Sequence, residues 1–230
     1  KVKSRVFHDN HIVPKHPYRS ILSGESGSGK TNLLIKLLSE RRFYKDFFHA
    51  IFIISPTASV LDDSWAQIIN MKTKTKIHLI NDLNCDDIES IMEINKGHIE
   101  ELGVHKAPRI LIIYDDVISD IKFMNSKAFV KSFIASRHYN SSVIICTQRY
   151  NSVPRVCRLQ ADSLYYFKGK NSERERLADE YCPAGYTKKE FITVIDYATN
   201  EPYSFLYVNG KADLKHRYRK NLDTILELQK

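Results

Sequence analysis

The amino-acid sequence predicts an α/β domain whose central sheet is mainly parallel and is flanked by helices. Short apolar runs recur along the chain at Ser20–Ser23, Ala50–Ile54, Ile77–Ile80, Arg109–Tyr114 and Ser142–Thr147. Several of them lack polar alternation, which is typical of strands buried on both faces. Segments with helical spacing separate these runs, and this alternation favours a doubly wound sheet.

Helical spacing predicts the intervening helices, and a charged segment after the last of the strand-like runs is a further helix candidate. These helices are expected at Asn32–Arg42, Asp86–Leu102, Asn125–Tyr139 and Ser172–Cys182. Asp86 is a candidate N-cap and Gly103 follows the same helix, where a glycine often ends one. Because each helix stands between or beside predicted strands, the helices are expected to cover the sheet.

The last part of the chain no longer alternates between strand-like and helix-like segments. Two β-rich runs, Phe191–Tyr197 and Tyr203–Asn209, flank a short polar connection that contains Pro202. This pattern predicts a C-terminal antiparallel hairpin. No internal repeat or clear linker interrupts the sequence, so we expect one domain over residues 1–230, with its core at about 18–168 and the hairpin and a basic tail at about 185–230.

Composition restricts the possible partners and compartments. The net charge of +8 favours an anionic partner such as nucleic acid, although a basic protein without such a partner is the alternative. The four cysteines form no Cys-x-x-Cys pair, which favours reduced, structural thiols in a cytosol-like compartment. No apolar stretch approaches the ~20 residues of a membrane span, so no direct membrane insertion is expected.

Residues 24–31 form a complete phosphate-binding loop of the pattern G-x-x-x-x-G-K-[ST]. Its expected nucleotide ligands are Gly24, Glu25, Ser26, Gly27, Ser28, Gly29, Lys30, Thr31 and the following Asn32. The glycines leave backbone N–H groups open to phosphate oxygens, and the helix N-terminus favours an anion. Lys30 can reach the β- and γ-phosphates, and the Thr31 hydroxyl can bind Mg²⁺. The motif predicts binding of ATP, with a Gly/Ser surface turn as the alternative.

A pair of acidic residues ends the apolar run that reads RILIIYDD, at residues 109–116. Asp115 has the position of a Walker B residue, which holds Mg²⁺ against Thr31. Asp116 can polarise a water molecule for attack on the γ-phosphate. Paired acids also occur as helix caps, but the upstream phosphate-binding loop favours the catalytic interpretation. A second acid favours hydrolysis over small-molecule phosphorylation.

Gln148 follows the run Ser142–Thr147, at the edge of the sheet where the γ-phosphate is expected. A glutamine there can contact both the attacking water and the phosphate, which is a sensor role. Four arginines lie nearby in the sequence: Arg137, Arg149, Arg155 and Arg158. One or two of them can act as a finger on a neighbouring subunit's γ-phosphate, and the others are expected to be surface or DNA-facing charges.

The phosphate-binding loop, the IIYDD segment and the stretch SRHYNSSVIICTQRYNSVPRVCRLQADSLYYF together resemble a known family. They are similar to the DNA-packaging ATPases of large DNA viruses, including pox-like viruses, and of smaller relatives such as virophages. These proteins belong to the FtsK–HerA superfamily of ring-shaped DNA pumps. The resemblance runs from about Ser20 to Lys168 and more weakly to Asn209, and its most specific part joins Arg137 to Gln148 and Arg158.

The resemblance implies a P-loop NTPase fold of the ASCE, RecA-like type, with ATP and Mg²⁺ as cofactors. It implies that Lys30 and Thr31 bind phosphate and metal, that Asp115 binds the metal, and that Asp116 is the catalytic carboxylate. Gln148 would be the sensor, and Arg137 and Arg158 are unranked candidates for the trans finger. Many relatives have Asp-Glu where this chain has Asp-Asp, so the carboxylate at position 116 is one methylene shorter.

The function implied by the resemblance is ATP-driven packaging of double-stranded viral DNA into a preformed capsid. The implied partners are double-stranded DNA, further copies of the chain in a ring with six subunits as the default, and capsid or portal-vertex membrane proteins. The implied location is the virion or the host cytoplasm at the assembly site. The alternatives are a cellular-type HerA or FtsK translocase or helicase, a nucleotide kinase, and a nucleotide-dependent scaffold.

Basic segments supply candidates for DNA contact. The exposed-loop candidates are Lys72, Lys74, Lys76, Lys122 and Lys127, and the tail Lys211–Lys230 carries a further basic cluster. Contacts to phosphates without base readout suit a pump that must accept any sequence. For the first three lysines a solvated loop is the alternative. For the tail, the alternatives are binding to a subunit or capsid protein and a plain solvated helix.

Overall fold

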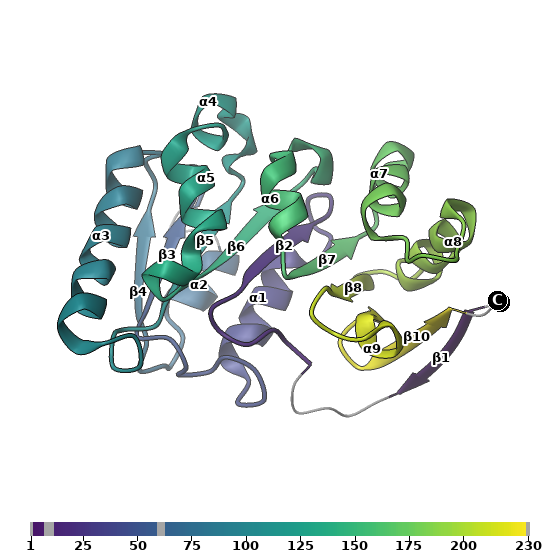
Figure 1. Cartoon of the computed structure of the whole chain (residues 1–230), viewed down its shortest axis with the longest axis horizontal. Helices are drawn as coiled ribbons and strands as arrows, with labels where there is room; N and C mark the ends of the chain where they lie inside the picture. The colour runs from purple at the N-terminus through teal and green to yellow at the C-terminus, as the bar shows by residue number, and fades with distance from the viewer. Residues whose placement is uncertain (1, 7–11, 59–62, 229–230) are drawn as a thin grey trace.

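The computed structural model describes residues 2–6, 12–58 and 63–228. Within these ranges, ten strands form one sheet in the order β1-β10-β9-β8-β7-β2-β6-β5-β3-β4 (Figure 1). The strands are β1 Val2–Val6, β2 Arg19–Ser23, β3 Ala50–Ile54, β4 Lys76–Ile80, β5 Ile110–Asp115, β6 Ser141–Thr147, β7 Ser163–Phe167, β8 Phe205–Asn209, β9 Tyr218–Lys220 and β10 Thr224–Leu228.

The six strands from β7 to β4 are parallel, and β2 lies between β6 and β7. All five apolar runs identified in the sequence fall in this parallel part, which confirms the predicted α/β class. The other four strands, β8, β9, β10 and β1, extend the sheet with antiparallel pairings. The carboxyl ends of the parallel strands therefore meet along one edge.

Helices cover both faces of the sheet (Figure 1). One face packs against α3 Cys85–Leu102, α5 Lys127–Ile134, α6 Arg155–Gln160, α7 Asn171–Tyr181 and α8 Lys188–Ala198. The other packs against α1 Lys30–Ser39 and α2 Asp63–Ile69. Along β5, Ile112 faces the first layer while Leu111 and Ile113 face the second, as the two-residue period of a strand requires. The remaining short helices are η1 Val117–Ser119, α4 Ile121–Met124, η2 Ser136–Tyr139, η3 Tyr150–Ser152 and α9 Leu214–Arg217.

Side-chain caps set two helix starts differently from the sequence prediction. The Asn84 side chain, not Asp86, caps α3 by accepting a hydrogen bond from the Asp86 backbone N–H at 2.9 Å. The predicted helix Asn125–Tyr139 is divided into α5, which Ser126 caps, and η2. Gly103 does end α3, and its φ of 77° is one that a glycine adopts easily.

The predicted hairpin is wrong in its first strand, because Phe191–Tyr197 lies within helix α8. A capping box begins this helix: the Thr187 hydroxyl accepts from the Glu190 N–H, and the Glu190 carboxylate accepts from the Thr187 N–H. The buried residues of α8 are Phe191, Val194, Ile195 and Ala198, which repeat at helical spacing. The second run does form a strand, β8, but it pairs with β7 and β9.

The basic tail is divided between a short helix, α9, which carries Lys215, His216 and Arg217, and strand β9 of the sheet. A plain solvated helix is therefore wrong only for the part that forms β9. Arg219 and Lys220 lie in β9 and are only 3% and 9% exposed. The Lys220 ammonium donates hydrogen bonds to Asn200 Oδ1 at 2.8 Å and Glu201 Oε1 at 2.7 Å. Lys220 therefore holds the sheet to the preceding loop, whereas Arg219 donates to the Leu222 carbonyl in the turn that follows β9. In the part of the chain that the structure describes, no helix is both long and apolar enough to cross a bilayer.

Candidate active site

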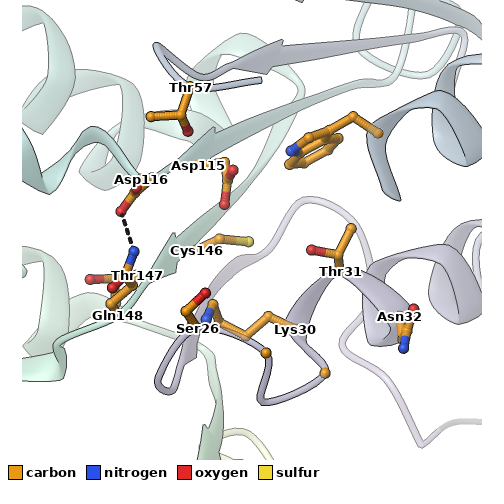
Figure 2. A pocket seen from close by; sticks show the side chains of 13 residues that line it. Ser26, Lys30, Thr31, Asn32, Thr57, Asp115, Asp116, Cys146, Thr147 and Gln148 are labelled. Carbon is orange, nitrogen blue, oxygen red and sulfur yellow. Dashed lines mark hydrogen bonds between the residues drawn. The ribbon is translucent and has the colours of Figure 1, made fainter. Parts of the chain in front are cut away.

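An open pocket of about 300 Å³ lies where the carboxyl ends of β2, β5 and β6 meet (Figure 2). The phosphate-binding loop forms one wall, and the ends of β5 and β6 form the opposite wall. The lining residues are Ser26, Gly27, Gly29, Lys30, Thr31, Asn32, Thr57, Trp65, Asp115, Asp116, Cys146, Thr147 and Gln148. The fold thus brings three separate sequence motifs into a single cavity.

The glycines of the loop have distinct structural roles. Gly27 and Gly29 adopt φ values of 73° and 103°, which side chains disfavour, and Gly29 directly precedes α1. Gly24 packs tightly, because a Cβ added there would lie 2.5 Å from Phe167 Cβ. The Gly24 N–H donates to the Thr147 carbonyl at 3.1 Å, which ties the loop to the end of β6. The loop is therefore held in a shape suited to an anion.

Lys30 points along the inside of this loop. Its ammonium donates hydrogen bonds to the carbonyls of Gly24 and Glu25, at 2.6 and 2.9 Å. Burial lowers the pKa of Lys30, while the nearby Cys146, Asp115 and Asp116 act in the opposite direction. A partly desolvated ammonium ion gains strongly from an anionic ligand, so phosphate oxygens are a suitable partner.

Asp115 ends β5 and is held by neighbours that the sequence did not identify. Its Oδ2 accepts a hydrogen bond from the Ser55 hydroxyl at 3.3 Å, and the Trp65 indole N–H also bonds to this carboxyl group. Burial, and then the charge of Asp116, raises the pKa of Asp115 to about 6. A cation close to this carboxylate would relieve both effects.

The donors present fit Mg²⁺ bound together with a nucleotide. Thr31 and Asp115 offer hard oxygen ligands, and they line the same pocket. Among the described residues, no group of three or more His, Cys, Asp or Glu side chains forms a separate metal site. Mg²⁺ commonly completes its coordination with phosphate oxygens and water, so two protein ligands are sufficient.

Asp116 and Gln148 contact each other at one end of the pocket (Figure 2). The Gln148 side-chain amide donates a hydrogen bond to Asp116 Oδ1 at 3.2 Å. Asp116 has a left-handed backbone with φ of 52°, which turns its side chain out of the strand direction. Left-handed residues other than glycine occur often at functional sites. A carboxylate and an amide placed together in this way can orient one water molecule.

The two finger candidates lie in different environments. Arg158 is only 8% exposed and pairs with Glu180 of α7, with its NH2 3.0 Å from Oε1. It also donates to the Val153 carbonyl, so its guanidinium joins α6 to neighbouring segments. The finger role of Arg158 stays a prediction, and its burial and its pairing with Glu180 disfavour it. Arg137 is exposed in η2, before the amino end of β6 and far along the strand from Gln148.

Four pocket residues, Thr57, Trp65, Cys146 and Thr147, were absent from the predicted site, as was Ser55, which bonds to Asp115. Ser55 and Thr57 directly follow the apolar run Ala50–Ile54, so the rule that strand ends line the site points to them. Trp65 lies in α2 with no local motif around it. Only the packing of α2 against the sheet brings its ring to Asp115.

Comparison with known sequences identifies the family. A family model described as "Poxvirus A32 protein" matches residues 5–208. The chain belongs to this family. Within the curated proteins, the "DNA packaging protein OPG160" of monkeypox virus is 29% identical over 185 residues, which are 79% of this chain and 58% of that protein. The variola virus protein of the same name has the same identity, and 64% of its length is covered. The match thus spans about 60% of these relatives.

Solved structures show the fold of this A32 family member. The genome packaging NTPase B204 from Sulfolobus turreted icosahedral virus 2, in complex with AMP, aligns with a TM-score of 0.59 and 16% identity, covering 89% of this chain and 96% of that one. EssC (ATPases 2 and 3) from Geobacillus thermodenitrificans gives a TM-score of 0.58 and 13% identity, covering 92% and 39%. The P-loop fold and the viral-packaging resemblance predicted from the sequence are confirmed.

Proposed function

We propose that this chain is an ATP-hydrolysing translocase that packages double-stranded viral DNA into a preformed capsid. The observation that carries the proposal is the hydrogen bond between Asp116 and Gln148, opposite Lys30 in the pocket. A nucleotide-binding protein does not need this pair, whereas hydrolysis does, because water must be oriented. The names of the A32 relatives, which are DNA packaging proteins, support DNA as the cargo.

The chemistry follows from the positions of the side chains. The loop N–H groups bind the phosphates, and Lys30 exchanges its two carbonyl partners for phosphate oxygens. Thr31 and Asp115 would hold Mg²⁺, which neutralises charge on the phosphates. Asp116 polarises the attacking water and Gln148 orients it. Water then attacks the γ-phosphorus, the bond to the β–γ bridging oxygen breaks, and inorganic phosphate and ADP are formed.

Arg137 supports a ring in which neighbouring copies share their sites. It precedes β6, whose seven residues end next to Gln148. At ~3.3 Å per residue, the strand separates Arg137 from Gln148 by roughly 20 Å. The arginine is therefore too far away to serve the γ-phosphate of its own site, and we propose that it serves that of another copy. We propose a homo-oligomeric ring, with six copies as the default, that docks on capsid or portal-vertex membrane proteins at the virus assembly site.

The lysines predicted to contact DNA form two groups, one near the amino ends of the parallel strands and one near their carboxyl ends. Lys72, Lys74 and Lys76 lie before or at the amino end of β4. Lys122 and Lys127 lie in α4 and α5, after the carboxyl end of β5. Replacing each group with glutamate separates their roles, since only the group that tracks DNA will lower DNA stimulation and its salt dependence.

The decisive experiment measures ATP hydrolysis with and without long double-stranded DNA. We expect DNA to stimulate hydrolysis, and Lys30→Ala and Asp116→Ala to abolish the activity. Hydrolysis that is indifferent to DNA in every assembly state would contradict the proposed motor. Arg176→Ala is the matched control, because this arginine is exposed on α7, away from the pocket-lining residues.

Mixing two inactive variants tests the shared site. Subunits with Arg137→Ala retain an intact pocket, and subunits with Asp116→Ala retain the finger. Mixed rings therefore contain some complete sites, and activity should return. Full turnover by Arg137→Ala alone would exclude Arg137 as the finger.

A further inference from the structure

Tyr203 lies beside Gly29 of the phosphate-binding loop. It precedes β8, which runs antiparallel to β7 and pairs Phe205 with Phe167. The amino end of β8 thus reaches the same edge as the carboxyl ends of the parallel strands. A Cβ built on Gly29 would lie 3.4 Å from Cδ1 of Tyr203 and 3.6 Å from its Cβ. Tyr203 is therefore a direct neighbour of the residue that begins the nucleotide-binding helix.

The conformation of Tyr203 is unusual for its residue type. It is 69% exposed, and its φ is 62°. The other non-glycine residues with positive φ in the described chain are all Asp or Asn: Asp46, Asp116, Asn140 and Asn221. Asp and Asn tolerate this conformation, whereas a bulky aromatic residue is strained in it. Since the ring is exposed, packing in the core does not compensate for the strain.

The order of the residues along the pocket indicates which end would hold the base of a bound nucleotide. Asp116 and Gln148 mark the end where the γ-phosphate is hydrolysed, and Asn32 lies on the other side of Lys30 (Figure 2). In a nucleoside triphosphate, the base is at the end remote from the γ-phosphate. Gly29, which Tyr203 touches, directly precedes Lys30 and α1. The base therefore leaves the loop over the start of α1, beside the tyrosine ring.

We propose that Tyr203 is the stacking platform for the base of the bound nucleotide. The proposal rests on the proposed function, since it assumes that the pocket holds a nucleoside triphosphate. An exposed aromatic face stacks on any base and reads none of its hydrogen-bonding edge. A purine has the larger ring system, so the site prefers purine over pyrimidine nucleotides and distinguishes ATP from GTP only weakly.

Two variants separate the ring from the backbone. Tyr203→Asn removes the ring but suits the left-handed backbone, so the loop keeps its shape. Tyr203→Phe keeps the ring and removes only the hydroxyl. Calorimetric titration with ATP and with inorganic tripolyphosphate, both with Mg²⁺, then measures the base and phosphate contributions apart. For Tyr203→Asn we expect roughly tenfold weaker ATP binding, from the lost stacking, and unchanged tripolyphosphate binding. Tyr203→Phe should bind both probes like the wild type.

Each failure has its own signature. Unchanged ATP affinity in folded Tyr203→Asn would overturn the stacking proposal, and so would an equal loss for tripolyphosphate, which would mean a disturbed phosphate-binding loop. Dissociation of the oligomer with full nucleotide affinity would also overturn it and assign Tyr203 to a contact between copies. If the wild-type protein bound neither probe, the proposed function itself would fail.

A second readout depends only on the base. In the wild-type protein, CTP should bind several-fold more weakly than ATP, because stacking area decides the preference. In Tyr203→Asn the two affinities should converge. A preference for ATP over CTP that survives in this variant would overturn the proposal.

Discussion

The two ends of the parallel strands use the same kinds of residues in opposite ways. At the carboxyl ends, Asp116 adopts a left-handed backbone and its side chain reaches into an open pocket. At the amino ends, Asn140 also adopts a left-handed backbone, with φ of 44°. Its amide, however, donates to the carbonyls of Ala107 and Pro108 at 3.2 and 3.1 Å. One left-handed polar residue reaches into the pocket, and the other is bonded within the fold.

Further residues at the amino ends extend this difference. His16 bonds through Nε2 to Asn140 Oδ1 at 3.0 Å and through Nδ1 to the Ser142 hydroxyl at 2.7 Å. The Asn95 amide donates to the Tyr139 carbonyl at 2.6 Å. A buried polar group stabilises a fold when it is paired and is costly when it is not. The amino ends should therefore determine stability, and the carboxyl ends activity.

The largest effect is expected for Asp116→Asn at the carboxyl ends. Asparagine can still accept the Gln148 hydrogen bond, but it cannot polarise water, so kcat should fall by about 10²–10⁴. The dissociation constant for ATP and the thermal unfolding midpoint should change little. Steady-state kinetics, calorimetry and a melting curve test this, and a kcat within tenfold of wild type would remove Asp116 from its catalytic role.

The second effect is expected for Asn140→Ala at the amino ends. Alanine loses the amide hydrogen bonds and disfavours the left-handed backbone, so the free energy of unfolding should fall by about 2–4 kcal/mol. Urea unfolding measures the loss. Asn140→Gly is the control, because glycine accepts the backbone and loses only the hydrogen bonds. A change below about 0.5 kcal/mol in Asn140→Ala would mean that this network does not stabilise the fold.

His16 adds a pH dependence to the amino ends. Burial lowers its pKa from the ordinary 6.5 to about 4. Between pH 7 and pH 5 the unfolded chain therefore binds a proton that the folded chain does not, and the free energy of unfolding falls by about 2 kcal/mol. This stability is complete above pH 6.5 and is lost as the pH falls toward 4.

The His16 contribution is isolated by comparison with His16→Gln. Urea unfolding at pH 7, 6 and 5 should show a steeper loss for the wild-type protein than for this variant. The raised pKa of Asp115 acts in the opposite sense, but it is common to both proteins and cancels in the difference. If the free energy of unfolding fell equally with pH in both proteins, His16 would be accepting a proton in the folded state.

The smallest effect is expected for Trp65→Phe. Phenylalanine fills the space but lacks the N–H that bonds to Asp115. Groups that orient a metal ligand typically change metal affinity by ~10- to 100-fold, and we expect the lower limit here. The Mg²⁺ concentration for half-maximal ATP hydrolysis should rise about tenfold, with kcat at saturating Mg²⁺ unchanged. Ser55→Ala should shift it in the same direction, and an unshifted Mg²⁺ curve in both variants would contradict the positioning role.

The sequence was sufficient for those parts of the site that are contiguous motifs. The loop at 24–31, the Asp115–Asp116 pair and Gln148 each follow a predicted strand, so the topology of a parallel sheet brings them together. It was insufficient where contacts are long-range. Arg158 is buried where Glu180, on another helix, pairs with it. The burial of Arg158 could therefore not be predicted from its neighbours in the chain.

Local composition misled the prediction of α8. Residues 191–197 are rich in β-branched and aromatic side chains, which favour a strand. The Thr187 and Glu190 pair was the available sign of a helix start, and the apolar spacing agreed with it. Consequently, the loop after α8 that brings Tyr203 to the site was interpreted as a hairpin connection.

The two carbonyl bonds of Lys30 have a kinetic consequence. They hold the side chain along the loop, so the ammonium group lies close to where phosphate oxygens are expected to bind. Nucleotide capture then exchanges one set of bonds for another and orders little additional chain. We therefore expect association to be limited by diffusion and not by loop rearrangement, so that the time between successive turnovers is set by a step after nucleotide binding.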